Sequence, residues 1–107
     1  MAATPEPARH EVPKVDEAAL AAARSADKLL VCARERGSQR WIDFLGPVPD
    51  LLRDAGVGEL RAVAMRARAA YGPRDSIRDA LPVELTGPFL DDIDRLRRLL
   101  ARELAER

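Results

Sequence analysis

The chain has 107 residues, a length that fits one domain and leaves no room for two. Lysine and arginine together number 18, as do aspartate and glutamate, so no net charge draws the chain toward nucleic acid or an anionic membrane. One cysteine and one histidine exclude an internal disulfide, a cysteine-based metal site and a histidine-pair metal site. With 47% hydrophobic and 34% charged residues, the composition is that of a folded soluble domain.

Residue usage predicts an all-α fold. Alanine occurs 19 times and leucine 14 times, whereas valine, isoleucine and threonine together occur 12 times. Alanine and leucine favour helices, and β-branched residues favour strands. We therefore expect a small antiparallel bundle of four main helices plus short helical turns, preceded by a disordered N-terminal tail. Arginine outnumbers lysine 16 to 2, which fits either carboxylate and phosphate binding or, more simply, the codon bias of a GC-rich genome.

Residues 1–14 form the predicted tail, and residues 15–107 form the single helical domain. The tail contains Pro5, Pro7 and Pro13 and few apolar residues, so we expect neither a signal peptide nor a folded element. Its deletion should then leave the melting temperature unchanged. No apolar run approaches the roughly 20 residues of a membrane-spanning helix. The expected location is the cytoplasm, with no membrane partner.

The first predicted helix spans residues 17–36. Alanines recur on one of its faces at helical spacing, and Leu29, Leu30 and Val31 supply most of its hydrophobic weight. Gly37 provides the left-handed residue that ends the helix. Because alanine is small, we expect a neighbouring helix to approach this face closely.

The second predicted segment, residues 38–45, has the densest aromatic content of the chain. The sequence Gly46-Pro47-Val48-Pro49 follows it and predicts a break or a sharp kink. Each proline removes a backbone donor and disfavours helix in the residue before it. A short helix is expected next, starting at Pro49 or Asp50 and ending at Ala55.

Further helical segments are predicted in the second half of the chain. A third clear helix covers residues 59–71, one or two turns cover 76–81, and residues 83–86 are expected to be a connector. The last helix, 88–106, has Pro88 in its first turn, where the missing N–H is harmless. We expect ten larger apolar side chains in the core: Leu30, Trp41, Leu45, Leu52, Leu60, Val63, Phe89, Ile93, Leu96 and Leu100.

The residue pattern contains no catalytic motif. His10 lies in the predicted tail with no nucleophile beside it, and Cys32 lies inside a helix, where packing is its usual role. Two pairs of carboxylates lie four residues apart with arginines nearby in sequence, so surface ion pairs explain them better than a metal or glycosidase site. These pairs are Asp50 with Asp54 and Asp75 with Asp79. We therefore expect a protein that is not an enzyme and has no catalytic residue, metal or cofactor.

Residues 50–71 give a pattern similar to a helix-turn-helix, with a short helix, a glycine turn and an arginine-bearing helix. Three features weaken this hypothesis. Leu52 stands where such motifs favour a small residue, Ala62 stands where they bury a β-branched one, and the acidic Glu59 begins the proposed recognition helix. DNA binding is therefore the alternative hypothesis, with candidate contacts at Arg61, Arg66, Arg68 and Arg74.

The aromatic segment supplies the candidate protein interface. Trp41 and Leu45 share one helix face and are assigned to the core, which leaves Phe44 at the edge of that face and Ile42 more nearly outward. Either a wide apolar stripe is fully covered by the last helix, or the two side chains form an exposed patch beside the proline break. The candidate interface consists of Arg40, Ile42, Asp43 and Phe44.

These observations favour a small, non-catalytic module that binds another protein. A toxin-neutralising role, as an immunity protein, and an adaptor role both belong to this class. Alanine-lined helices bury little surface each, so a homodimer is a second expectation.

Overall fold

The computed structural model describes residues 6–105, apart from the side chain of Leu104, and confirms the all-α fold. The first five residues of the predicted tail lie outside the described residues. Residues 6–105 contain no strand. The described elements are the 3₁₀ turn η1 (Arg9–Glu11) and the helices α1 (Pro13–Glu35), α2 (Gln39–Leu45), α3 (Val48–Asp54), α4 (Val57–Ala69), α5 (Ile77–Ala80) and α6 (Val83–Ala105).

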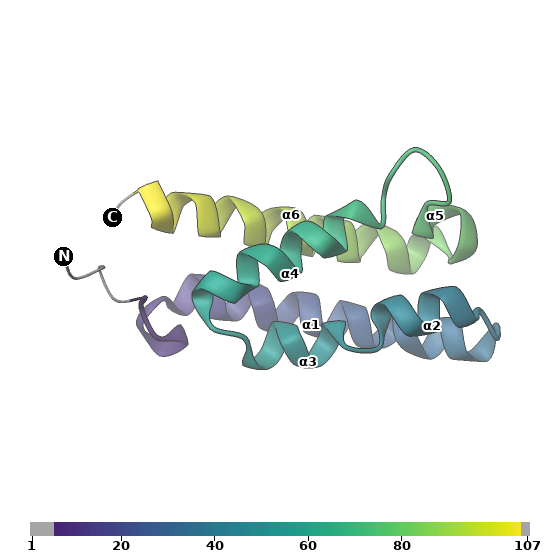
Figure 1. The fold of residues 1–107 in the computed structure, drawn as a ribbon, viewed down its shortest axis with the longest axis horizontal. Coiled ribbons are helices and arrows are strands. Elements are labelled where there is room, and N and C mark those ends of the chain that lie inside the picture. Colours follow the sequence, from purple (N-terminus) through teal and green to yellow (C-terminus); the bar gives the residue numbers. More distant parts are fainter. Residues whose placement is uncertain (1–5, 106–107) are drawn as a thin grey trace.

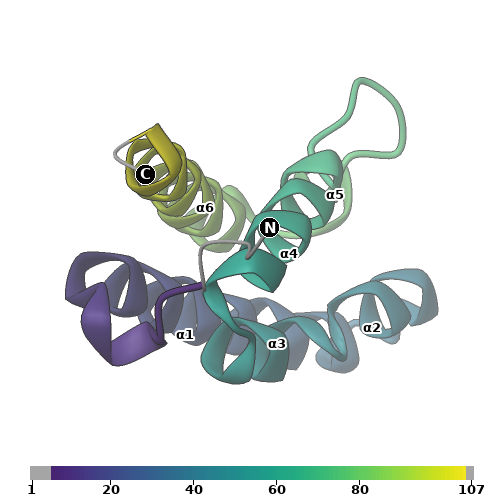
Figure 2. The ribbon, with the colours of Figure 1, turned by 60° about the vertical axis from the view of Figure 1, so that its left-hand side comes forward.

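The helices form two layers of an elongated bundle, with α1, α2 and α3 in one layer and α4, α5 and α6 in the other (Figures 1 and 2). The chain runs along α1, returns along α2 and α3, runs out again along α4 and returns along α6 (Figure 1). The bundle is 49 Å long and 24 Å across. Its antiparallel path matches the prediction, with α2 and α3 together forming the second of the main segments.

An alanine stripe on α1 forms the centre of the bundle, because α2, α3 and α6 all pack against this helix. The stripe residues are 0% or 1% exposed, and they are Ala18, Ala19, Ala22, Ala23, Ala26 and Ala33. Gly37 follows the helix with φ 66°, the left-handed conformation predicted for it. The predicted close approach of other helices to this face therefore fits the observed packing.

All ten predicted core side chains are buried. Their relative exposure ranges from 0% to 9%, and the largest fully buried one is Phe89 of α6. Of the three larger apolar side chains near the end of α1, Leu29 and Leu30 are buried, whereas Val31 is 51% exposed. Val31 is one residue beyond the inward stripe, and a rotation of about 100° per residue turns it toward solvent.

The first helix begins earlier than predicted. Helix α1 begins at Pro13 instead of residue 17, and Val12 is buried in the core. Proline suits the first helical position because its missing N–H has no partner there in any helix. Arg9 anchors the preceding turn, with its Nε 2.8 Å from Asp16 Oδ1 and its Nη1 donating to the carbonyl of Ala55 at 2.9 Å.

The Gly-Pro-Val-Pro segment breaks the second helical segment, as the sequence predicts. Gly46 and Pro47 form a turn between α2 and α3, and both keep right-handed helical dihedral angles. Helix α3 begins at Val48, so Pro49 falls in its first turn, where a missing N–H is tolerated. The two short helices therefore follow one another along α1.

The last helix begins earlier than predicted, and residues 83–86 are helical instead of a connector. The carbonyl of Pro82 accepts hydrogen bonds from the N–H groups of Leu85 (3.0 Å) and Thr86 (2.9 Å). These bonds start the helix one turn before Gly87. Pro88 consequently lies inside α6, not in its first turn, and removes one N–H from the helical ladder.

Candidate functional site

The four predicted interface residues lie on α2 and differ in exposure. Arg40 and Asp43 are exposed, whereas Ile42 and Phe44 are half-buried and pack against the edge of the core. Helix α2 packs mainly on α1. The two apolar side chains are therefore neither fully covered nor freely exposed.

Phe44 belongs to a cluster of aromatic rings and arginines. Its ring meets that of Trp41 edge to face, with 5.5 Å between the ring centroids and 72° between the planes. The Arg40 guanidinium lies 4.9 Å from the Trp41 ring centroid, and the Arg66 guanidinium of α4 lies 5.5 Å from that of Phe44. Each guanidinium is attracted by the electron-rich ring face. We call Arg40, Phe44 and Arg66 the arginine–aromatic surface, and Trp41, which is 5% exposed, supports it from the core.

An ion pair joins this surface to the loop that follows α4. Arg40 Nη1 lies 3.5 Å from Asp75 Oδ2, and both side chains are mostly exposed. Asp75 has φ 51°, a left-handed conformation that aspartate adopts more readily than most residues. Solvent and salt weaken such an exposed pair, so it orients Arg40 more than it stabilises the fold.

Tyr71, which follows α4, also has two arginines beside its ring. It is hydrogen-bonded to α6 and does not belong to the arginine–aromatic surface. The Tyr71 hydroxyl donates to the carbonyl oxygen of Thr86 at 2.5 Å, and Arg68 and Arg78 lie 6.0 Å and 5.5 Å from its ring centroid. Burial raises the pKa of the Tyr71 hydroxyl, although the two cations oppose that shift. Tyr71 therefore remains a neutral hydrogen-bond donor that holds the loop against α6.

Helices α3 and α4 follow one another across Ala55 and Gly56, and the predicted DNA contacts differ in their surroundings. Arg61, Arg66 and Arg74 are exposed, and Arg74 lies in the loop beyond α4. Arg68 is half-buried, with its Nε 3.4 Å from Asp94 Oδ1 of α6. Two of the four cations thus face groups of their own chain, Arg66 over Phe44 and Arg68 beside Asp94.

The residues that could have carried catalysis lie apart from one another. His10 is exposed in η1, and Cys32 is half-buried against the core. Asp75 precedes α5, so it does not share a helix face with Asp79, whereas Asp50 and Asp54 are both exposed on α3. Between them, Arg53 pairs with Asp27 of α1 instead of either aspartate. Within residues 6–105, no group of three or more histidine, cysteine or acidic side chains could hold a metal ion.

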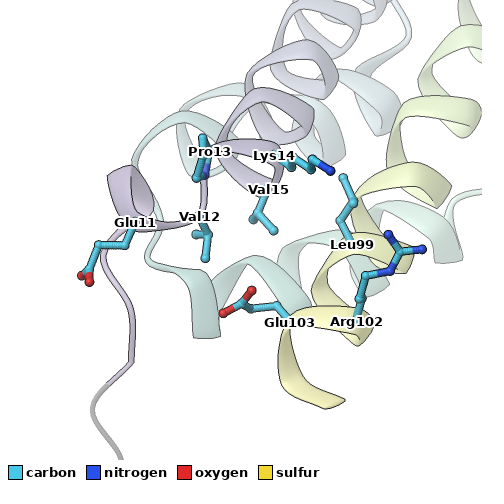
Figure 3. Close-up of a pocket in the computed structure, with 8 residues that line it drawn as sticks. All are labelled: Glu11, Val12, Pro13, Lys14, Val15, Leu99, Arg102 and Glu103. Atoms are coloured by element: carbon cyan, nitrogen blue, oxygen red, sulfur yellow. The ribbon is translucent and has the colours of Figure 1, made fainter. Parts of the chain in front are cut away.

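A hollow of about 360 Å³ lies between the beginning of α1 and the end of α6 (Figure 3). Val12, Val15 and Leu99 give it an apolar floor, and Lys14 and Arg102 lie on the side of Leu99. Its described lining contains no serine, cysteine or histidine that could act as a nucleophile or base. Its charged lining residues are Glu11, Lys14, Arg102 and Glu103.

No protein-family model, curated protein or solved structure matches the chain. Among residues 6–105, no helix is both long enough and apolar enough to cross a membrane. The chemistry of the arginine–aromatic surface is therefore the basis for assigning a function. Sequence patterns placed Phe44 and Arg66 in two competing sites, whereas the fold brings them together.

Proposed function

We propose that this protein is a small cytoplasmic, non-catalytic module that binds another protein through the arginine–aromatic surface and its neighbours Ile42 and Asp43. The observation that supports this proposal is the stacking of two guanidinium groups on an edge-to-face aromatic pair. A toxin-neutralising role and an adaptor role both belong to this class of module.

The chemistry of these side chains suits a protein partner. Arginine is enriched among the residues that contribute most to protein binding. A guanidinium that lies over a ring can still direct its N–H donors outward to a carboxylate. Because the rings pack on the core edge, little conformational entropy is lost on binding. We expect a partner that offers an apolar side chain to Phe44 and carboxylates to Arg40 and Arg66.

DNA binding by α3 and α4 is the weaker hypothesis. Arg68 is paired with Asp94, and Glu59 places a carboxylate in the first turn of the proposed recognition helix. Base edges and phosphates would face this turn in a helix-turn-helix complex. A carboxylate there repels phosphate.

The test begins with affinity capture from the native cell extract, followed by purification of the captured protein and titration against pure chain. The double change Arg40→Ala with Arg66→Ala should weaken binding about 10-fold to about 1,000-fold, as loss of central interface residues does. The double change Ile42→Ser with Phe44→Ser should weaken it too. This second double variant should also be less stable than the wild-type chain by about 1–3 kcal/mol. The loss is smaller than the one expected from truncating two fully buried side chains.

Two control variants change exposed side chains elsewhere, Arg61→Ala on α4 and Val83→Ser on α6, and should bind normally. Equal binding by the Arg40 and Arg66 double variant would contradict the proposal. A duplex-DNA titration tests the alternative. Binding to duplex DNA that weakens steeply between about 50 and about 200 mM salt would favour DNA binding over protein binding as the function.

A further inference from the structure

An apolar groove lies on α1, where the end of α1 runs beside the beginning of α6 (Figure 1), and none of its lining residues belongs to the arginine–aromatic surface. It encloses about 370 Å³ and is lined by Asp27, Lys28, Val31, Cys32, Glu35 and Leu85. Val31 is 51% exposed, and Cys32 and Leu85 are half-buried against the core. An exposed valine beside two half-covered apolar side chains is a surface that gains from being covered.

The charges at the two ends of this groove are opposite and symmetrically placed. Lys28 lies one helical turn before Val31 and Cys32, and Glu35 lies one turn after them. Both charged side chains are exposed, and neither forms an ion pair within the described residues. Asp27, by contrast, already pairs with Arg53 of α3.

We propose that a second copy of the chain covers this groove, with the two α1 helices crossing antiparallel about a two-fold axis between Val31 and Cys32. A two-fold axis at this point places Lys28 of each copy opposite Glu35 of the other, and Val31 opposite Cys32. A parallel arrangement would oppose Lys28 to Lys28 and Glu35 to Glu35. Charge complementarity therefore selects both the orientation and the register of the pair.

The size of the surface predicts a reversible dimer. The apolar centre consists of three side chains per copy, Val31, Cys32 and Leu85, which is less than a permanent interface buries. Self-association should therefore increase with protein concentration. The arginine–aromatic surface is not used, so the dimer and the proposed partner can be tested separately.

Charge reversal gives a direct test by analytical ultracentrifugation over a concentration series up to about 1 mM. The wild-type chain should associate, and Lys28→Glu alone or Glu35→Lys alone should weaken association about 10-fold or more, because like charges then face each other. An equimolar mixture of the two single variants should associate again. In that mixed pair the two substituted side chains face each other with opposite charges, and the unchanged Glu35 of one copy faces the unchanged Lys28 of the other.

The controls use the same two substitutions on the first turns of α1, Lys14→Glu and Glu17→Lys, which should leave association unchanged. All four positions are exposed, and circular dichroism melts verify that each variant folds. A short bis-maleimide provides a second measurement, because the single cysteine of each copy lies next to the axis. It should link wild-type chains and the mixed pair in higher yield than either single variant.

Three results would overturn the proposal. The wild-type chain could remain monomeric throughout the series, association could persist unchanged in both single variants, or the mixture could fail to restore it. Loss of the captured partner's binding in the same variants bears on the proposed function and not on the dimer.

Discussion

Tyr71 shows how one side chain connects a loop to the bundle. Its hydroxyl donates to the Thr86 carbonyl, and burial raises its pKa above the ordinary value of 10.0 because the phenolate would lose its hydration. In the unfolded chain this hydroxyl ionises near the ordinary value. Above that pH the unfolded state releases a proton that the folded state keeps, so stability falls as the pH rises.

We therefore predict that the free energy of unfolding is insensitive to Tyr71 ionisation below about pH 10 and decreases above it. The variant Tyr71→Phe should lack this alkaline loss, although at neutral pH it should be about 0.5–1.5 kcal/mol less stable because one hydrogen bond is gone. Urea unfolding at several pH values measures both effects. The chain has one tyrosine, so phenolate absorbance reports its ionisation directly. Equal alkaline losses in the two proteins would contradict the prediction.

The sequence predicts burial at individual positions much better than it predicts contacts between them. Leu60 and Val63 on one helix, like Ile93 and Leu96 on another, recur at helical spacing, and that periodicity alone assigns them to the core. The contact between Phe44 and Arg66 joins residues 22 positions apart on different helices, and no local pattern contains that information. Arg66 could therefore be recognised as a surface cation, but its position over an aromatic ring required the fold.

At the scale of elements, the beginnings of helices were the least predictable features. Pro13 and Pro88 are both compatible with a first helical turn, and the structure places only Pro13 there. Pro82 directly precedes the last helix, and its carbonyl accepts the first backbone hydrogen bonds. A proline is compatible with the first turn of a helix, but its presence alone does not show that a helix starts there.

The N-terminal segment makes contacts with the bundle that its sequence pattern does not predict. Three prolines suggest a tail, yet Val12 is buried and Arg9 bonds to Asp16 and to the Ala55 carbonyl. The Gly58 N–H at the start of α4 also donates to the Glu6 carboxylate. The segment thus links α1 to the junction between α3 and α4.

We predict that deletion of residues 1–14 lowers the free energy of unfolding by about 1–3 kcal/mol, because a buried valine and the Arg9 contacts are lost. This is opposite to the expectation from the sequence. Differential scanning calorimetry should show a melting temperature lower by about 4 °C or more. The control deletes residues 1–5 and keeps all of these contacts, so its melting temperature should be unchanged. A deletion of residues 1–14 that melts like the full chain would show that the contacts add no stability.

The whole molecule depends on the alanine stripe of α1. Three elements, α2, α3 and α6, pack against one helix because its buried side chains are small. Close helix contact of this kind allows a chain with four aromatic residues to form a continuous core. It also leaves little room for larger side chains, since protein interiors are packed as densely as organic crystals.

We predict that Ala22→Leu destabilises the protein by about 1–3 kcal/mol, because the added atoms must force the helices around α1 apart. Ala22 is 0% exposed. The matched control is Ala62→Leu on the exposed face of α4, where the same side chain enters solvent and should change stability by less than about 0.5 kcal/mol. Leucine and alanine both favour helices, so helix propensity does not separate the two variants. Urea unfolding of both variants measures the difference, and equal stabilities would show that α1 does not set the spacing of the bundle.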